Sequence, residues 1–192
     1  MSDRIRIVKR EELSRRWARN TMYEIDYRFR DGHRQILHRE VHDHGSGAAV
    51  LPYDPTRHTV LLVRQFRLPV HLSGRDGDTL EVCAGLLDGN DPETCARREA
   101  EEELGYRLSN LRQVAQTFMT PGAVTEELTL FLAEYDLSSR ISGGGGHPAE
   151  HEDIEVVEMA FADLLAMVRD QRIIDAKTVM LTLFLERALL TP

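Results

Sequence analysis

The chain has 192 residues, of which 42% are hydrophobic and 29% are charged, proportions typical of a folded globular protein and not of a disordered chain. Its 24 Lys and Arg against 32 Asp and Glu give a net charge of −8, which argues against nucleic-acid binding, since that depends on many cationic contacts to phosphate. Two cysteines are too few for a disulfide framework, and no targeting segment or membrane-spanning stretch is recognisable. We therefore expect a cytoplasmic protein without nucleic-acid or membrane partners.

The first half of the chain is predicted to consist mainly of strands. Residues 21–41 alternate apolar and polar side chains on either side of a turn at Asp31 and Gly32, a pattern typical of a β-hairpin. The continuous apolar run over residues 59–63 indicates a strand covered on both faces. Further strands are predicted over residues 48–53, 59–68 and 80–84.

The second half mixes helices with strands. A helix is predicted to begin after Asp91, a good N-cap that Pro92 follows, and to end at Gly105. Strands are expected over residues 111–118, 128–136 and 154–161, and helices over residues 163–171 and 176–190. This order predicts an α/β (α+β) fold, an α/β/α sandwich around a mixed sheet. Residues 1–43 are expected to form a separate N-terminal β region and residues 44–192 the main domain.

The helix after Asp91 carries a run of carboxylates. Ala96, Ala100 and Leu104 fall on one side and predict its packed stripe, and Glu99 and Glu103 stack one turn apart at the margin of that stripe. A solvated acidic face is the ordinary interpretation of such a run. Its alternative is a site for Mg²⁺, with Mn²⁺ as a substitute, because paired carboxylates near an apolar margin repel each other unless a hard cation offsets them.

Four consecutive glycines, residues 143–146, precede a cluster of acidic and histidine residues. A tolerated surface insertion is one interpretation of this segment. A flexible hinge that carries carboxylates over a charged ligand, as a lid does, is the other. His147 and His151 are interpreted as solvated side chains and not as zinc ligands.

Residues 98–106, Arg-Glu-Ala-Glu-Glu-Glu-Leu-Gly-Tyr, resemble the helical half of the Nudix box, and residues 84–88, Ala-Gly-Leu-Leu-Asp, resemble its first half. The pattern departs from the box at one point: Asp91 stands where the first Glu is usual, and the loop to Arg98 is one residue short. Segments at 63–67, 83–88, 121–126, 152–156 and 176–179 extend the resemblance over most of the chain, to the GDP-mannose pyrophosphatase branch of the Nudix hydrolases, which is close to the ADP-ribose pyrophosphatases.

This resemblance implies a homodimeric hydrolase of small-molecule nucleotide sugars that uses Mg²⁺. It implies the Nudix α/β/α sandwich, with the N-terminal β region serving in dimerisation and forming part of the substrate pocket. Cleavage of GDP-mannose to GMP and mannose 1-phosphate is the favoured activity. Hydrolysis of ADP-ribose or another nucleotide sugar is an alternative, and a Nudix module that senses a nucleotide sugar without cleaving it is a second.

The resemblance also assigns roles to residues. The metal ligands are the carboxylates of Glu99 and Glu103, the backbone carbonyl of Ala84, and Glu152. Arg98 is expected to hold a carboxylate of the box, Glu102 to be an outer or additional ligand, and Glu152 or Glu126 to be the base that activates water. The implied substrate contacts are Trp17, His38, Arg39, Glu40, Arg67, Ala84, Gly85, Leu86, Glu126, His151 and Lys177.

Three of these contacts have ordinary alternatives. Trp17, the only tryptophan, either stacks on guanine or packs in the dimer interface. Arg67 either binds phosphate through two parallel hydrogen bonds or is a plain surface arginine. Lys177 either contacts the substrate or is simply a lysine at the start of a helix.

Overall fold

The computed structural model describes residues 3–147 and 152–190. The chain divides into two compact units. The N-terminal unit comprises Met1–Ser46 and Phe118–Glu127, and the main unit comprises Gly47–Thr117 and Leu128–Pro192. Each unit is built on its own sheet.

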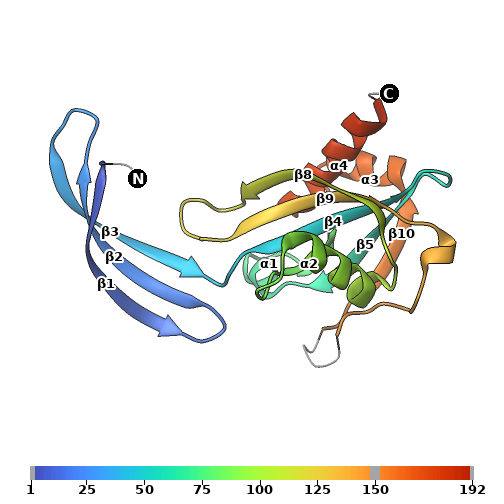
Figure 1. Cartoon of the computed structure of the whole chain (residues 1–192), viewed down its shortest axis with the longest axis horizontal. Coiled ribbons are helices and arrows are strands. Elements are labelled where there is room, and N and C mark those ends of the chain that lie inside the picture. The colour runs from blue at the N-terminus through green and yellow to red at the C-terminus, as the bar shows by residue number, and fades with distance from the viewer. Residues whose placement is uncertain (1–2, 148–151, 191–192) are drawn as a thin grey trace. The chain divides into compact units, whose positions relative to one another are not determined.

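The N-terminal unit holds an antiparallel three-stranded sheet in the order β1-β2-β3 (Figure 1). Strands β2 (Arg19–Arg28) and β3 (Arg34–Asp43) confirm the predicted hairpin. Strand β1 (Ile5–Arg15) was not predicted, and two register irregularities in its pairing with β2 explain why. A bulge shifts the side chains that follow it to the opposite face, so the sequence loses its two-residue period.

The main unit contains a mixed seven-stranded sheet. Its central path runs β10-β5-β4-β9-β8, with β6 paired to β5 and β7 paired to β4. Strands β4 and β9 are parallel, whereas β4 pairs antiparallel with both β5 and β7. The strands are β4 (Gly47–Asp54), β5 (Thr59–Phe66), β6 (Asp78–Glu81), β7 (Cys83–Leu86), β8 (Ser109–Phe118), β9 (Glu127–Glu134) and β10 (Glu155–Ala160).

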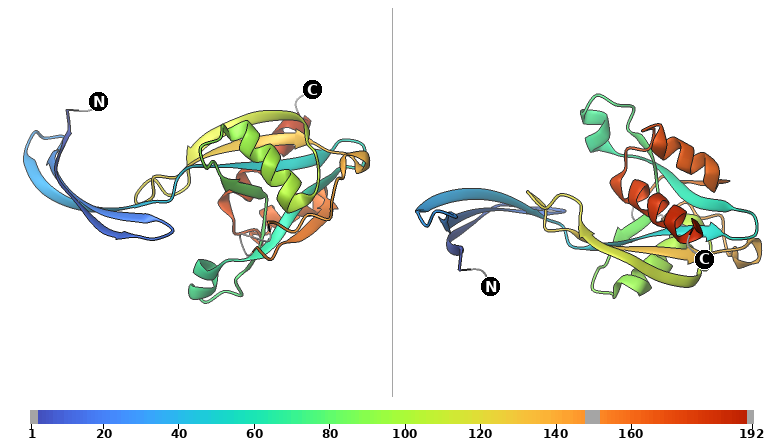
Figure 2. Two further views of the ribbon diagram at one scale, coloured as in Figure 1. Left: turned by 60° about the horizontal axis from the view of Figure 1, so that its bottom comes forward. Right: turned by 90° about the horizontal axis from the view of Figure 1, so that it is seen from above.

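Helices cover both faces of this sheet and confirm the predicted sandwich. Helix α2 (Pro92–Glu99) lies on one face, and α3 (Phe161–Arg169) and α4 (Ala176–Leu190) lie on the other (Figure 2). A 3₁₀ turn, Leu137–Ser139, follows β9. None of the described helices is long and apolar enough to cross a membrane.

Two predicted strands differ from the structure for local reasons. The strand expected over residues 59–68 ends at Phe66, because Pro69 lies in the first turn of a short helix, α1 (Leu68–Leu72). The strand expected over residues 80–84 is divided at Val82, whose backbone N–H donates to the Thr178 hydroxyl at 2.8 Å.

The packed stripe of helix α2 is as predicted. Ala96, Ala100 and Leu104 are at most 1% exposed and belong to one core cluster with residues of β4, β5 and β9. The Asp91 carboxylate caps the helix by accepting from the Thr94 N–H at 3.0 Å. The last turn, Ala100–Leu104, is a π-helix that Gly105 ends with φ +78°.

Gly105 is required both by its backbone conformation and by its surroundings. A Cβ there would lie 2.6 Å from the backbone oxygen of Ser142. Gly89 shares the positive φ, at +87°, but a Cβ there would meet nothing within 4 Å. A side chain at Gly89 would therefore meet only conformational strain, whereas one at Gly105 would meet both that strain and steric overlap.

We expect Gly89→Ala to lower the free energy of unfolding by about 1 kcal/mol, the cost of a left-handed residue with a side chain. Gly105→Ala should cost at least about 2 kcal/mol, because a clash with backbone adds to that strain. Urea denaturation of both variants measures the difference. Equal losses of unfolding free energy in the two variants would contradict this prediction, because they would show that the end of the helix shifts to accommodate the added methyl group.

Candidate active site

Helix α2 and its π-turn direct two glutamates into the protein. Glu99 is 8% exposed and Glu103 is 2% exposed, so they are more deeply buried than the margin of the stripe that the sequence predicts. The N–H of Gly105 donates to the carbonyl of Ala100, five residues earlier, which is the wide spacing of a π-helix, a form that is frequent at functional sites. The carboxylates therefore lie inside the unit and not on a solvated face.

Strand β7 packs directly against these carboxylates. A Cβ at Gly85 would lie 1.9 Å from Oε1 of Glu99, so only glycine allows this approach. The N–H of Ala84 donates to Oε2 of Glu103 at 3.2 Å. The structure thus brings Ala84 and Gly85 together with Glu99 and Glu103.

Arg98 joins this group from the same helix. Its guanidinium lies 2.6 Å from Oε1 of Glu99 and 3.2 Å from Oε2 of Glu102, and it donates to the carbonyl of Leu86 at 3.2 Å. Its Nε is buried and has no hydrogen-bond partner among residues 3–147 and 152–190. One cation therefore ties the helix to β7 and partly offsets two of the carboxylates.

The glycine run is packed on the end of this helix. The N–H groups of Gly145 and Gly146 donate to the carbonyls of Glu103 at 2.8 Å and Glu102 at 3.1 Å. Beyond the run, the carboxylate of Glu152 accepts from the N–H of His147 at 2.9 Å. Two of the four glycines are therefore hydrogen-bonded to the end of the helix in this conformation, and the lid interpretation stays a prediction.

Part of that loop cannot be compared with the sequence-based expectations. His151, a predicted substrate contact, and the other residues of 148–151 lie outside the described residues. The interpretation of His147 and His151 as solvated rather than zinc-binding stays a prediction.

The electrostatics of Glu103 are those of a buried acid near other acids. Burial raises the pKa of Glu103 to about 8, and the charges of Glu99 and Glu152 add to the effect, while hydrogen bonds from the Cys83 thiol and the Ala84 amide oppose it. Such a cluster gains most from a divalent cation, which offsets the repulsion and favours carboxylate oxygens.

The donor set fits a hard divalent metal ion. Carboxylate and backbone carbonyl oxygens suit Mg²⁺ or Mn²⁺. Within the described ranges, no three His, Cys, Asp or Glu side chains are arranged to hold a metal ion as they stand. Protein donors engage the carboxylates instead: Arg98, the Ala84 amide and the His147 amide.

Arg67 and Lys177 lie in a second charged group of the main unit. Arg67 donates to both oxygens of Glu81, at 2.8 and 2.9 Å, and Lys177 donates to Glu81 and, at 2.9 Å, to Asp175. Burial opposes ionisation of Glu81, but Arg67 and Lys177 outweigh it and lower its pKa to about 2. Neither cation is therefore a plain surface side chain.

The remaining predicted site residues belong to the N-terminal unit. The indole of Trp17 is 74% exposed, and it stacks on the ring of His44 with centroids 5.0 Å apart. The others are His38, Arg39 and Glu40, which are exposed on β3, and Glu126, which is half-buried in the segment Phe118–Glu127.

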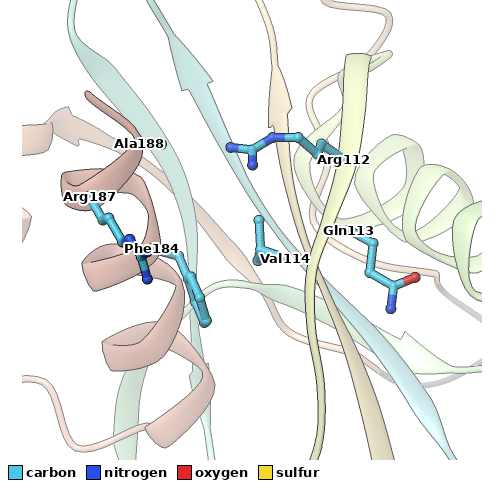
Figure 3. A pocket seen from close by; sticks show the side chains of 6 residues that line it. All are labelled: Arg112, Gln113, Val114, Phe184, Arg187 and Ala188. Atoms are coloured by element: carbon cyan, nitrogen blue, oxygen red, sulfur yellow. The ribbon is translucent and has the colours of Figure 1, made fainter. Parts of the chain in front are cut away.

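A cavity of about 560 Å³ lies elsewhere, between β8 and α4 (Figure 3). Arg112 and Val114 point from β8 toward the helix, and Gln113 points away. Its lining residues are Arg112, Gln113, Val114, Phe184, Arg187 and Ala188. Because no carboxylate lines it and α4 covers the face of the sheet opposite α2, the cavity is separate from the acidic site.

The sequence interpretation missed Glu81, Asp175 and Thr178. The signal for Glu81 was present, since an acid inside an apolar strand needs a buried cationic partner. Asp175 and Thr178 have the spacing of a helix cap, which gives no hint of further contacts. Only the structure brings the start of α4 to the β6–β7 junction.

Comparison with protein families gives two adjacent matches. Residues 43–179 match the NUDIX domain model, and residues 4–42 match the model of the N-terminal domain of the GDP-mannose pyrophosphatase NudK. Together the two models cover almost the whole chain.

Curated relatives match over nearly their full length. The chain is 47% identical over 184 residues to the GDP-mannose pyrophosphatase of Pectobacterium atrosepticum, which covers 94% of this chain and 93% of the relative. It is 45% identical over 189 residues to the enzyme of that name from Salmonella paratyphi B, covering 97% of both chains. Among solved structures, an ADP compounds hydrolase has the same fold, with a TM-score of 0.73, 19% identity, and coverage of 97% of this chain and 95% of that one.

The raised pKa of Glu103 predicts a specific pH dependence of stability. In the unfolded chain the carboxyl ionises near 4.5, whereas in the metal-free folded protein it ionises near 8. The metal-free protein should therefore lose stability relative to Glu103→Gln as the pH rises from about 4.5 to about 8. Thermal unfolding with a chelator, from pH 5 to pH 9, measures the difference between the two proteins.

Adding Mn²⁺ at the upper pH should raise the unfolding temperature of the parent protein and not that of Glu103→Gln, because ligation requires the ionised carboxylate. Glu101→Gln, which changes an exposed acid of the same turn, serves as the control and should keep the response. A metal response that survives in Glu103→Gln would contradict the assignment of this carboxylate.

Proposed function

The chain belongs to the Nudix family, and from that membership we propose that it hydrolyses the pyrophosphate of GDP-mannose to GMP and mannose 1-phosphate with Mg²⁺ as cofactor. Similarity over nearly the full length to relatives named GDP-mannose pyrophosphatase carries this assignment of substrate. We also propose a cytoplasmic homodimer, and the two free, buried cysteines support a reducing compartment.

The acidic cluster supports metal-assisted hydrolysis. Glu99, Glu103, Glu152 and the carbonyl of Ala84 would hold the metal, for which Mn²⁺ can substitute. When bound, the ion offsets charge on the phosphoryl oxygens and lowers the pKa of a bound water molecule. Arg98 positions the Glu99 carboxylate through their 2.6 Å ion pair, and Glu102 is an outer or additional ligand.

Attack of water on the pyrophosphate also needs a group that accepts a proton. Glu152 and Glu126 are alternatives for this base. Glu152 lies beside Gly146, where an added Cβ would be 2.4 Å from its Oε2, and the N–H of Gly146 donates to the carbonyl of Glu102 at 3.1 Å. This position at the end of the acidic helix supports Glu152 as a ligand or base.

The proposed substrate contacts are the residues that the resemblance implies. In the main unit they are Arg67, whose side chain is 42% exposed, Lys177, and the backbone of β7 at Ala84, Gly85 and Leu86. In the N-terminal unit they are Trp17, His38, Arg39, Glu40 and Glu126. The exposed indole of Trp17, which stacks on His44, is suited to stacking on a planar base. His151 is the remaining proposed substrate contact.

Incubation of the protein with GDP-mannose and Mg²⁺ should yield GMP and mannose 1-phosphate, which chromatography detects. Chelation should abolish turnover, and Mn²⁺ should restore it. Intact GDP-mannose after prolonged incubation with either metal would overturn the proposed activity. Comparison of kcat/KM between GDP-mannose and ADP-ribose tests the alternative substrate, and GDP-mannose should be favoured.

Single variants separate the roles of the carboxylates. Glu103→Gln should lower kcat by about 10³-fold or more while the fold is kept, because the cation loses a ligand. Full activity of this variant would contradict the ligand assignment. Of Glu152→Gln and Glu126→Gln, the one that replaces the base should lose the acidic limb of the pH–rate profile. Binding without turnover in the parent protein would support the sensing alternative.

The exposed side chains of β1 support dimerisation through the N-terminal sheet. Every residue of β1 is exposed, including four large apolar ones, and the described part of the N-terminal unit contains no helix that could cover them. A three-stranded sheet without a covered face is marginally stable. The apolar residues are Ile5, Ile7, Val8 and Leu13, between 42% and 49% exposed.

We expect the parent protein to sediment as a dimer and Ile7→Asp to shift it toward the monomer, since a charge in an apolar interface is costly. Leu72→Asp, at an exposed apolar site of the main unit (75% exposed), is the control and should leave the dimer intact. Analytical ultracentrifugation distinguishes the two. A dimer that Ile7→Asp leaves unchanged would contradict this interface.

A further inference from the structure

The start of helix α4 makes two contacts that its capping does not require. Asp175 accepts from the N–H of Thr178 at 3.0 Å and from its hydroxyl at 2.5 Å, which is an ordinary N-cap. Its second oxygen accepts from Lys177 at 2.9 Å. The hydroxyl of Thr178 in turn accepts from the backbone N–H of Val82 at 2.8 Å.

A matching cap elsewhere in the chain shows that these contacts are additional. At the start of α2, Asp91 accepts from the N–H of Thr94 at 3.0 Å and from its hydroxyl at 2.6 Å. Among the described residues, no lysine reaches Asp91 and no backbone N–H reaches the Thr94 hydroxyl. An Asp and a Thr three residues later are therefore enough to cap a helix. The contacts to Lys177 and Val82 at the start of α4 are not needed for capping.

Both extra contacts lead toward the candidate active site. Lys177 is one of the proposed substrate contacts, and its ammonium is held between Asp175 and Glu81, the carboxylate that also fixes Arg67. Val82 is fully buried and joins β6 to β7, the strand that carries Ala84 and Gly85.

We propose that Asp175 and Thr178 are positioning residues for the hydrolysis: Asp175 holds the ammonium group of Lys177 toward the substrate, and Thr178 fixes the Val82 peptide and thereby the strand that supplies Ala84. This inference rests on the proposed function. Two cations and two carboxylates, Arg67, Lys177, Glu81 and Asp175, balance one another in this group. Without the charge of Asp175, the ammonium would be held by Glu81 alone and would lose the direction that the two carboxylates set together.

A double-mutant cycle tests the role of Asp175. Asp175→Asn keeps a residue that caps helices well but removes one of the two negative charges that hold Lys177. It should lower kcat/KM about tenfold, the scale of a charged hydrogen bond, mainly through KM. Combined with Lys177→Met it should add nothing to the loss that Lys177→Met causes alone, because Asp175 acts through that lysine.

Asp91→Asn is the matched control, since it makes the same change in a cap of the same form, and it should keep kcat/KM within about twofold. Additive losses in the double variant, or an Asp175→Asn protein as active as the parent, would overturn the role of Asp175. No release of GMP by the parent protein would overturn the proposed function and this inference with it.

The role of Thr178 has a readout that does not depend on turnover. Thr178→Val leaves the Val82 N–H without its acceptor, so hydrogen exchange of that amide, measured by NMR, should accelerate at least tenfold, and kcat should fall by a similar factor. Thr178→Ser, which restores the hydroxyl, should recover both. Thr94→Val changes the exposed cap of α2 and should alter neither.

Melting temperatures of all variants are measured by circular dichroism. If Asp175→Asn does not fold, Asp175→Ser, which keeps a good capping side chain and removes the charge, takes its place in the cycle with Lys177→Met. The Thr178→Val and Thr178→Ser pair tests the contact to Val82 independently. Faster exchange of the Val82 amide with kcat unchanged would overturn the role of Thr178, because its contact with Val82 would then stabilise the fold without affecting hydrolysis.

Discussion

The burial of Glu99 and Glu103 beneath strand β7 is the constraint on which the site depends. Two carboxylates that are at most 8% exposed repel each other strongly in a medium of low dielectric constant. Gly85 lets the strand close over them, since any side chain there would overlap Glu99. In the metal-free protein the repulsion is relieved by protonation of Glu103, whose pKa is raised to about 8, and by the ion pair of Glu99 with Arg98. A divalent cation would instead favour the ionised form of both carboxylates.

The π-turn and the glycine run shape this burial from the other end of the helix. Gly145 and Gly146 donate to backbone carbonyls of the turn, which the widened helix would otherwise leave without partners. Glu152 accepts from the N–H of His147, the residue after the run, and lies beside Gly146, so a third carboxylate is present at this end of the helix. In this conformation Gly145 and Gly146 therefore serve as close-packed backbone at the end of the helix.

The charged group around Glu81 has the opposite character. It is electrically balanced, with two cations and two carboxylates, and it is tied to the sheet through Val82 and to α4 through Asp175. Balanced groups of this kind contribute little net stability, but they fix the directions of their members. The main unit therefore contains both a cluster of buried carboxylates and two cations, Arg67 and Lys177, whose side chains are held in fixed orientations.

The sequence by itself determined the sandwich, the hairpin, the buried stripe of helix α2 and the acidic residues of that helix, because these features depend on local periodicity, on caps and on a short specific motif. It did not reveal β1, whose bulges remove the two-residue period, or the depth at which Glu99 and Glu103 lie, which depends on how closely β7 approaches. Only the tertiary structure decided that Arg67 and Lys177 are held by Glu81, and that Thr178 caps a helix and also binds Val82, 96 residues away. Contacts between residues so far apart in the chain leave no pattern in their local sequence, since packing of the sheet against α4 creates them.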